Sequence, residues 1–156
     1  MNLRSLEQER AAYAYECVKE VKEEDEKTQG RYAAYVKSAP VLILTNGLGQ
    51  TLAFYLAKIG KNIDEVDYKS IDPKSIEGGG DKKAYAYLYK HIARWLAEDI
   101  GCHKSLTNGT DPLKYIISQN STSLDVMLLT EEALFLLNWL KRFADAMLKK
   151  DKDSGE

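Results

Sequence analysis

The sequence has few of the residues that interrupt or cross-link a chain. Its 156 residues include only three prolines and two cysteines. Because an interior proline removes a helix hydrogen bond, so few of them leave room for long uninterrupted helices. Cys17 and Cys102 lie far apart, without the paired spacing of a zinc site. We therefore expect reduced thiols rather than a disulfide framework or a metal centre.

The chain also lacks an excess of positive charge. Its 22 basic and 24 acidic residues give a formal net charge of −2. A protein that grips nucleic acid alone usually carries a basic excess, because affinity grows with the number of phosphates neutralised. Any contact with nucleic acid is therefore expected from a local basic patch, or from a surface completed by partner molecules.

No apolar run is long enough to cross a membrane. The longest uncharged stretch near the C-terminal end, residues 133–140, falls far short of the roughly 20 residues that a spanning helix needs. Residues 1–10 are polar and charged, which is not the pattern of a signal peptide. We therefore expect a soluble, cytoplasmic protein.

Helical periodicity is the main pattern that the chain does contain. Apolar residues recur three and four positions apart, which is typical of amphipathic helices. The pattern predicts an all-α protein, a single-domain bundle over residues 1–150 with an irregular loop at 61–80 and a disordered tail at 151–156. The five to six expected helices cover residues 3–28, 30–38, 40–60, 81–100, 112–119 and 130–150.

Local signals set these expected boundaries. Gly30 is expected to separate the first two helices, and Pro40 to begin the third, where its missing N–H costs nothing. Residues 124–128 alternate between more and less apolar positions, which indicates an extended segment before the last helix. Favoured N-cap residues are expected to begin the later helices, namely Asp81, Asp111 (with Pro112) and Thr130.

The most apolar segment, residues 40–60, admits two interpretations. Val41–Leu44 could form a buried strand followed by a loop with Gly47 and Gly49, the layout of a phosphate-binding site. That loop lacks the third glycine of a dinucleotide fingerprint and the lysine of a P-loop. The other interpretation is one central helix whose glycines let another helix pack closely. It is favoured because the rest of the chain reads as helices.

The helical interpretation predicts two different faces for this segment. The buried seam would consist of Val41, Leu44, Leu48, Leu52, Tyr55 and Ile59. The opposite face would consist of Asn46, Gln50, Ala53 and Ala57. Asn46 and Gln50 are four residues apart on that face, and their amides would be close enough to pair.

Residues typical of catalysis or metal binding do not cluster in the sequence. His103 follows Cys102, but adjacent residues rarely share a face, and no second cluster with His91 completes a coordination shell. Glu131 and Glu132 fit acids in the first turn of a helix better than an acid–base pair. We therefore predict no catalytic site, no cofactor, no metal and no enzymatic activity.

Basic residues provide the strongest functional signal. Lys141, Arg142 and Lys149 are predicted to share the exposed stripe of the last helix, while Arg10 and Lys37 add positive charge near the N-terminal helices. One interpretation of this stripe is phosphate binding. The other is a solvated helix face with ion pairs four residues apart.

Three blocks of the chain together resemble a known family. They are LEQERAAYAY from Leu6, APVLILTNGLGQTLAF from Ala39, and TEEAL with LNWLKRFA from Thr130. In this order and spacing they are similar to the small helical subunit of the type III-B CRISPR effector, the Cmr RAMP-module complex. The resemblance extends from about Leu6 to Lys149.

The resemblance implies an all-α structural subunit of an antiviral complex, without catalysis of its own. Such subunits stack in more than one copy beside the backbone subunits that hold the guide RNA, and line the groove where target RNA pairs with the guide. The implied partners are the backbone subunit, the large subunit, guide RNA, target RNA and further copies of the chain. Arg10, Lys141 and Arg142 fall within the matching blocks, and with Lys37 and Lys149 they are the candidate RNA contacts. The rival hypothesis is a protein-only adaptor with no direct RNA contact.

Overall fold

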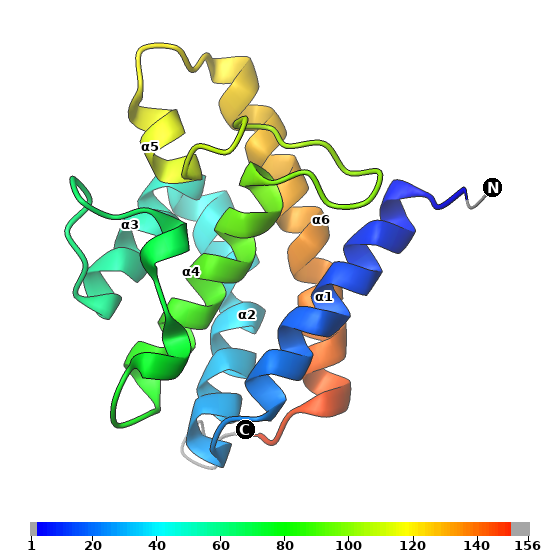
Figure 1. The fold of residues 1–156 in the computed structure, drawn as a ribbon, viewed down its shortest axis with the longest axis vertical. Helices are drawn as coiled ribbons and strands as arrows, with labels where there is room; N and C mark the ends of the chain where they lie inside the picture. The colour runs from blue at the N-terminus through cyan, green and yellow to red at the C-terminus, as the bar shows by residue number, and fades with distance from the viewer. Residues whose placement is uncertain (1–2, 151–156) are drawn as a thin grey trace.

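The computed structural model describes residues 3–150, and the predicted tail at 151–156 lies outside them. The described chain is built from helices, with one isolated bridge between Ile100 and His103 and no β-strand (Figure 1). The predicted all-α fold is confirmed. The α-helices are α1 (Leu6–Lys22), α2 (Glu26–Asn46), α3 (Leu48–Ile59), α4 (Asp81–Ala97), α5 (Pro112–Ile117) and α6 (Ser123–Met147).

Helix α4 is the centre of the fold. It packs against every other α-helix and against both short 3-10 helices of the preceding loop (Figure 1). A helix that is apolar around most of its circumference must lie between neighbours rather than on top of one. The prediction of a central helix at 40–60 is therefore wrong. The buried residues of α4 are Ala84, Ala86, Tyr87, Leu88, Tyr89, His91, Ile92, Ala93, Trp95, Leu96 and Ala97.

Residues 40–60 belong to two helices instead of one. Helix α2 continues through Gly30 and Pro40, so neither residue marks a helix boundary as predicted. The chain turns at Gly47, where φ is 93° and ψ is 156°, a conformation that glycine adopts far more easily than other residues. A Cβ at Gly47 would meet nothing within 4 Å. Backbone conformation, rather than close helix packing, therefore requires this glycine.

The turn at Gly47 changes which side chains of this segment are buried. Val41 and Leu44 lie on the outer side of α2 and are 65% and 72% exposed, contrary to the predicted seam. The rest of the seam, from Leu48 to Ile59 on α3, is buried as predicted. The face expected to pack against another helix is exposed instead. Its residues are Asn46, Gln50, Ala53 and Ala57.

Helix α6 begins earlier than predicted. Thr122 caps it, in a capping box with Asp125, which satisfies backbone N–H groups that the first turn leaves open. Thr130, the predicted N-cap, lies inside the helix, and its hydroxyl donates to the Val126 carbonyl at 2.7 Å. The extended segment predicted at 124–128 is therefore wrong. The alternation of more and less apolar positions in residues 124–128 arises because apolar residues also lie on the exposed side of this end of α6.

The end of α1 and the starts of α2, α4 and α5 also follow from local signals. Helix α1 ends at Lys22, and Asp25 caps α2 by accepting from the Thr28 backbone N–H. Acids near a helix C-terminus oppose the macrodipole, which explains the early end. Asp81 is the first residue of α4 and not its N-cap, because Gly80 occupies that position. Asp111 does cap α5, with Pro112 in the first turn, as predicted.

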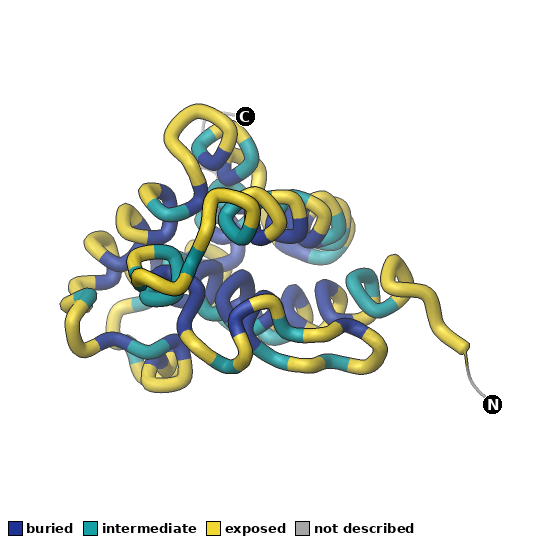
Figure 2. The backbone as a smooth tube through the Cα atoms, turned by 90° about the horizontal axis from the view of Figure 1, so that it is seen from above, coloured by how far each residue is buried: buried dark blue, intermediate teal, exposed yellow. Residues whose placement is uncertain are grey.

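The irregular loop predicted at 61–80 is confirmed, and it packs on α4. It contains the 3-10 helices η1 (Tyr68–Ser70) and η2 (Pro73–Ser75). The Tyr68 hydroxyl donates to Glu98 at 2.7 Å, and Lys90 Nζ donates to the Ile71 carbonyl at 2.7 Å. In the view of Figure 2, buried stretches gather between the helices and exposed ones cover the outer surface. Within residues 3–150, no helix combines the length and apolar character needed to cross a bilayer.

Candidate functional site

The five candidate RNA contacts do not form one continuous site. Lys37 on α2, Arg142 on α6 and Lys149 are exposed, while Lys141 is half-buried. Lys149 lies past the end of α6, so the predicted stripe shared by all three C-terminal cations is wrong. Only 12% of the Arg10 side chain is exposed.

Arg10 belongs to a buried ion pair between α1 and α6. Its Nε and Nη2 donate to the two carboxylate oxygens of Glu132, at 2.6 and 2.8 Å. Trp95 Nε1 on α4 donates to the same carboxylate at 2.9 Å. Burial raises the pKa of Glu132, but the hydrogen bonds from Arg10 and Trp95 outweigh it, so the pKa is lowered. Glu132 is thus not a first-turn acid, and Arg10 has a structural role.

Lys37 and Lys141 lie on neighbouring helices that run in opposite directions. Figure 1 shows α2 rising from the end of the molecule at which α6 finishes, and the two helices pack together. The Lys149 N–H donates to Gln29 Oε1 at 3.0 Å and joins their ends. Residue 37 is as far along the chain from Gln29 as residue 141 is from Lys149. Counted from that bond, the two cations therefore occupy corresponding positions on their helices.

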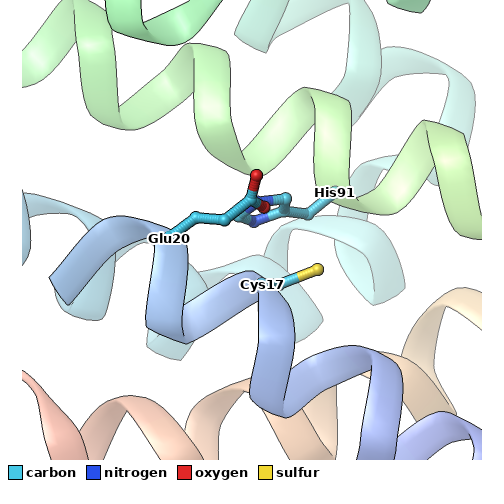
Figure 3. A group of neighbouring side chains, drawn as sticks. All are labelled: Cys17, Glu20 and His91. Atoms are coloured by element: carbon cyan, nitrogen blue, oxygen red, sulfur yellow. The ribbon is translucent and has the colours of Figure 1, made fainter. Parts of the chain in front are cut away.

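A buried polar cluster lies between α1 and α4 that the sequence did not indicate. Figure 3 shows Cys17 and Glu20 of α1 facing His91 of α4. His91 Nε2 lies 2.9 Å from Glu20 Oε1, and Nδ1 lies 2.8 Å from the Tyr32 hydroxyl. Because an ionised carboxylate can only accept, the neutral ring donates from Nε2 and accepts at Nδ1. Cys17 and Glu20 are three apart on one helix, but nothing in the spacing connects them with His91.

The residue types of this cluster are those of a metal site, since their donor atoms lie within 4.8 Å of one another. Arg94, however, lies among them, with Nη2 3.5 Å from Glu20 Oε1 and 3.8 Å from Cys17 Sγ. Its positive charge repels a metal ion and already neutralises Glu20. Burial also raises the pKa of Cys17 to about 12, so the sulfur is not the thiolate that metals bind. We interpret the cluster as a structural hydrogen-bond network.

The charges of this network are divided between two residues. Burial raises the pKa of Glu20, but hydrogen bonds from His91 and Arg94 outweigh it and lower the pKa to about 2. Burial lowers the pKa of His91, so its ring is neutral at neutral pH. The network therefore holds one ionised acid beside one arginine, and it leaves no free general base for catalysis.

These features define an all-helical protein held together by ion pairs and hydrogen bonds between helices, with exposed cations on α2 and near the end of α6. A family model described as CRISPR-associated protein (Cas_Cmr5) matches residues 6–147. The chain therefore belongs to the Cmr5 family, that of the small helical subunit of the type III-B Cmr complex. Members of this family are generally non-catalytic structural subunits.

The fold is similar to one that is known from crystallography. The similar structure is the X-ray crystal structure of a CRISPR-associated Cmr5 family protein from Thermus thermophilus. The TM-score is 0.58 at 24% sequence identity, over 93% of this chain and 99% of that chain. At this identity the likeness concerns the fold, and it supports the all-α architecture.

Proposed function

We propose that this protein is a non-catalytic structural subunit of a type III-B CRISPR ribonucleoprotein in the cytoplasm. In this role it stacks in multiple copies beside the guide-RNA backbone and helps to hold target RNA for antiviral defence. The family match over residues 6–147 is the observation that carries the proposal. The partners would be the backbone subunit, the large subunit, guide RNA, target RNA and neighbouring copies of the chain.

In this proposal, the cations that face RNA are Lys37, Lys141, Arg142 and Lys149. Arg10 is left out because Glu132 occupies its guanidinium. A chain with a net charge of −2 has little non-specific attraction for RNA, since affinity follows the number of phosphates neutralised. A stack of copies would repeat these cations along the RNA. They are therefore expected to act only in the assembled complex.

The first prediction reverses the three exposed charges among these cations. In the assembled complex, the variant Lys37→Glu, Arg142→Glu, Lys149→Glu should weaken target-RNA binding by roughly ten-fold or more, because it removes phosphate contacts. The dissociation constant is measured by fluorescence anisotropy over a salt series, whose slope should become shallower. All three side chains are exposed, so circular dichroism of the isolated variant should show unchanged helix content.

A matched control reverses the same number of exposed charges elsewhere. Lys61, Lys69 and Lys104 lie on the segments between α3 and α4 and between α4 and α5. Changing them to Glu alters the net charge equally, so a general electrostatic effect would weaken binding in both variants. Equal affinity of the test variant and the unmodified complex would contradict the RNA-facing role.

A second candidate function is that of a protein-only adaptor, and exposed apolar side chains favour it. Leu124, Met127 and Leu128 are exposed in the first turns of α6, as are Val41 and Leu44 on α2. Large exposed apolar groups that gather on a surface are typical of protein contacts. Ultraviolet crosslinking of the assembled complex distinguishes the two functions, because an adaptor without RNA contact forms no crosslink to target RNA.

A further inference from the structure

A hollow between α2 and α3 combines apolar walls with exposed amides. It is lined by Leu42, Asn46, Gln50, Thr51 and Phe54 and has a volume of about 280 Å³. Liquid water takes about 30 Å³ per molecule, so the hollow is far larger than a single water site. It is close to the lower end, about 300 Å³, of pockets that bind small molecules. The turn at Gly47 creates it by placing the two amides on different helices.

The two amides are the polar groups that this hollow offers to a ligand. Neither the Asn46 nor the Gln50 side chain forms a hydrogen bond within residues 3–150. The Thr51 hydroxyl is already engaged, since it donates to the Gly47 carbonyl at 2.9 Å. Each amide presents both donors and an acceptor. Amide side chains use this combination to read the edges of nucleic-acid bases.

Phe54 provides an aromatic face at the same place. Its side chain is 43% exposed, and its ring packs against Tyr55 and Tyr85 with centroids 5.9 and 6.0 Å apart. Lys58 Nζ lies over the ring, 5.4 Å from the centroid. Stacking on an aromatic ring holds unpaired bases without requiring a particular sequence. Lys58 is exposed and has a flexible stem, so it can turn from the ring to a neighbouring phosphate.

We propose that this hollow binds one unpaired base of single-stranded RNA. Phe54 stacks on the base, Asn46 and Gln50 hydrogen-bond to its edge, and Lys58 pairs with the adjoining phosphate. An occupant with a polar edge can hydrogen-bond to both amides, which an apolar protein side chain cannot do. The proposal rests on the proposed function, because RNA must lie against this subunit. It adds a contact with a base to the phosphate contacts of the exposed cations.

The variant Phe54→Leu tests the base site, because it keeps apolar volume and removes the aromatic face. In the assembled complex, it should weaken target-RNA binding by about ten-fold. Abasic nucleotides are placed one at a time along the target RNA. The one at the position that occupies the hollow should weaken RNA binding by the unmodified complex but add little to the effect of Phe54→Leu, since both changes remove the same contact. Target RNA that carries 4-thiouridine at that position should crosslink within residues 46–58.

A matched control is Phe135→Leu. Phe135 is 47% exposed and also lies under a cation, with Arg10 Cζ 4.6 Å from the ring centroid. This variant should leave the affinity unchanged, and both variants should retain the helix content of the unmodified chain by circular dichroism. Equal weakening by the two variants would overturn the base site, because the loss would then not be specific to the hollow.

Two further outcomes separate this proposal from the proposed function. If Phe54→Leu binds normally while the variant with three reversed charges binds weakly, the base site is wrong and the RNA-facing role stands. The same holds if 4-thiouridine crosslinks elsewhere on this subunit, or if a photoreactive group at residue 54 crosslinks only to protein. If neither variant weakens binding, both the base site and the RNA-facing role are wrong.

Discussion

Glu131 and Glu132 are adjacent in the sequence but have different roles in the structure. Glu131 is exposed, whereas Glu132 accepts hydrogen bonds from Arg10 and Trp95. Removing one member of a buried ion pair leaves the other charge uncompensated. The stability of this contact between α1, α4 and α6 therefore depends on all three groups being present.

For this ion pair, the prediction is that Glu132→Ala lowers the free energy of unfolding by about 3 kcal/mol, because it removes the buried partner of Arg10. The other acid beside Arg10 is Glu7, whose carboxylate lies 3.7 Å away and whose side chain is 62% exposed, so it compensates the charge only weakly. The neighbouring variant Glu131→Ala is the control and should change the free energy by less than about 0.5 kcal/mol, as is usual at exposed positions. Urea unfolding at neutral pH measures both. Similar losses for the two variants would show that the ion pair contributes no more than an exposed acid.

Among the helices and turns, the turn at Gly47 has the largest effect on which side chains are exposed. It divides an apolar segment into α2 and α3, exposes Val41 and Leu44, and opens the hollow lined by Asn46 and Gln50. Gly47 and Gly49 have different roles in this segment. Gly47 supplies a backbone conformation with positive φ, while Gly49 lies within α3.

The prediction for this element contrasts two substitutions. Gly47→Ala should destabilise the protein by about 1–3 kcal/mol, because a Cβ strains this backbone conformation. Gly49→Ala should be neutral or stabilising by up to about 1 kcal/mol, since alanine favours helix and its Cβ would meet Ile116 at an ordinary 3.5 Å. Thermal unfolding followed at 222 nm measures both. Destabilisation of equal size in the two variants would contradict this assignment of roles.

For the whole molecule, the central position of α4 makes the core continuous. Each of the other five α-helices packs against α4, and the loop at 61–80 is fastened to it through Lys90 and Ile71. A helix that leaves this arrangement would expose apolar surface of α4. The parts of the chain are therefore expected to unfold together.

The corresponding prediction is a single cooperative unfolding transition for the domain expected over residues 1–150. The midpoint by circular dichroism, which reports all helices, should coincide with the midpoint by tryptophan fluorescence. The fluorescence reports Trp95 in the core and the half-buried Trp139 on α6. Separate midpoints would show that the chain consists of units that unfold independently.

Much of the fold could be predicted from the sequence, and the errors have a common physical origin. The all-α class follows from apolar periodicity, and the start of α5 follows from Asp111 and Pro112, because both signals act within a few residues. Pro40 was predicted to begin a helix but lies inside α2. A proline signal is local, whereas the buried face of α2, with Val36, Ala39 and Ile43, continues past Pro40.

The candidate site could be predicted only in part. Lys37, Arg142 and Lys149 are exposed, as expected of residues that contact RNA. Arg10 carries the same charge, but its partner Glu132 comes from the other end of the chain. The group formed by Cys17, Glu20 and His91 was missed for the same reason, since no spacing rule connects α1 with α4.

By itself, the sequence determined the helical class, the near-neutral charge, the presence of exposed cations and the resemblance to a family. The first three properties depend on composition and on interactions between residues at most four positions apart, and the resemblance depends on the order of motifs along the chain. The tertiary structure alone decided that α4 is central, that α2 and α3 meet at Gly47, and that Arg10 is structural. Each of these depends on which distant side chains become neighbours when the helices bury their apolar faces together.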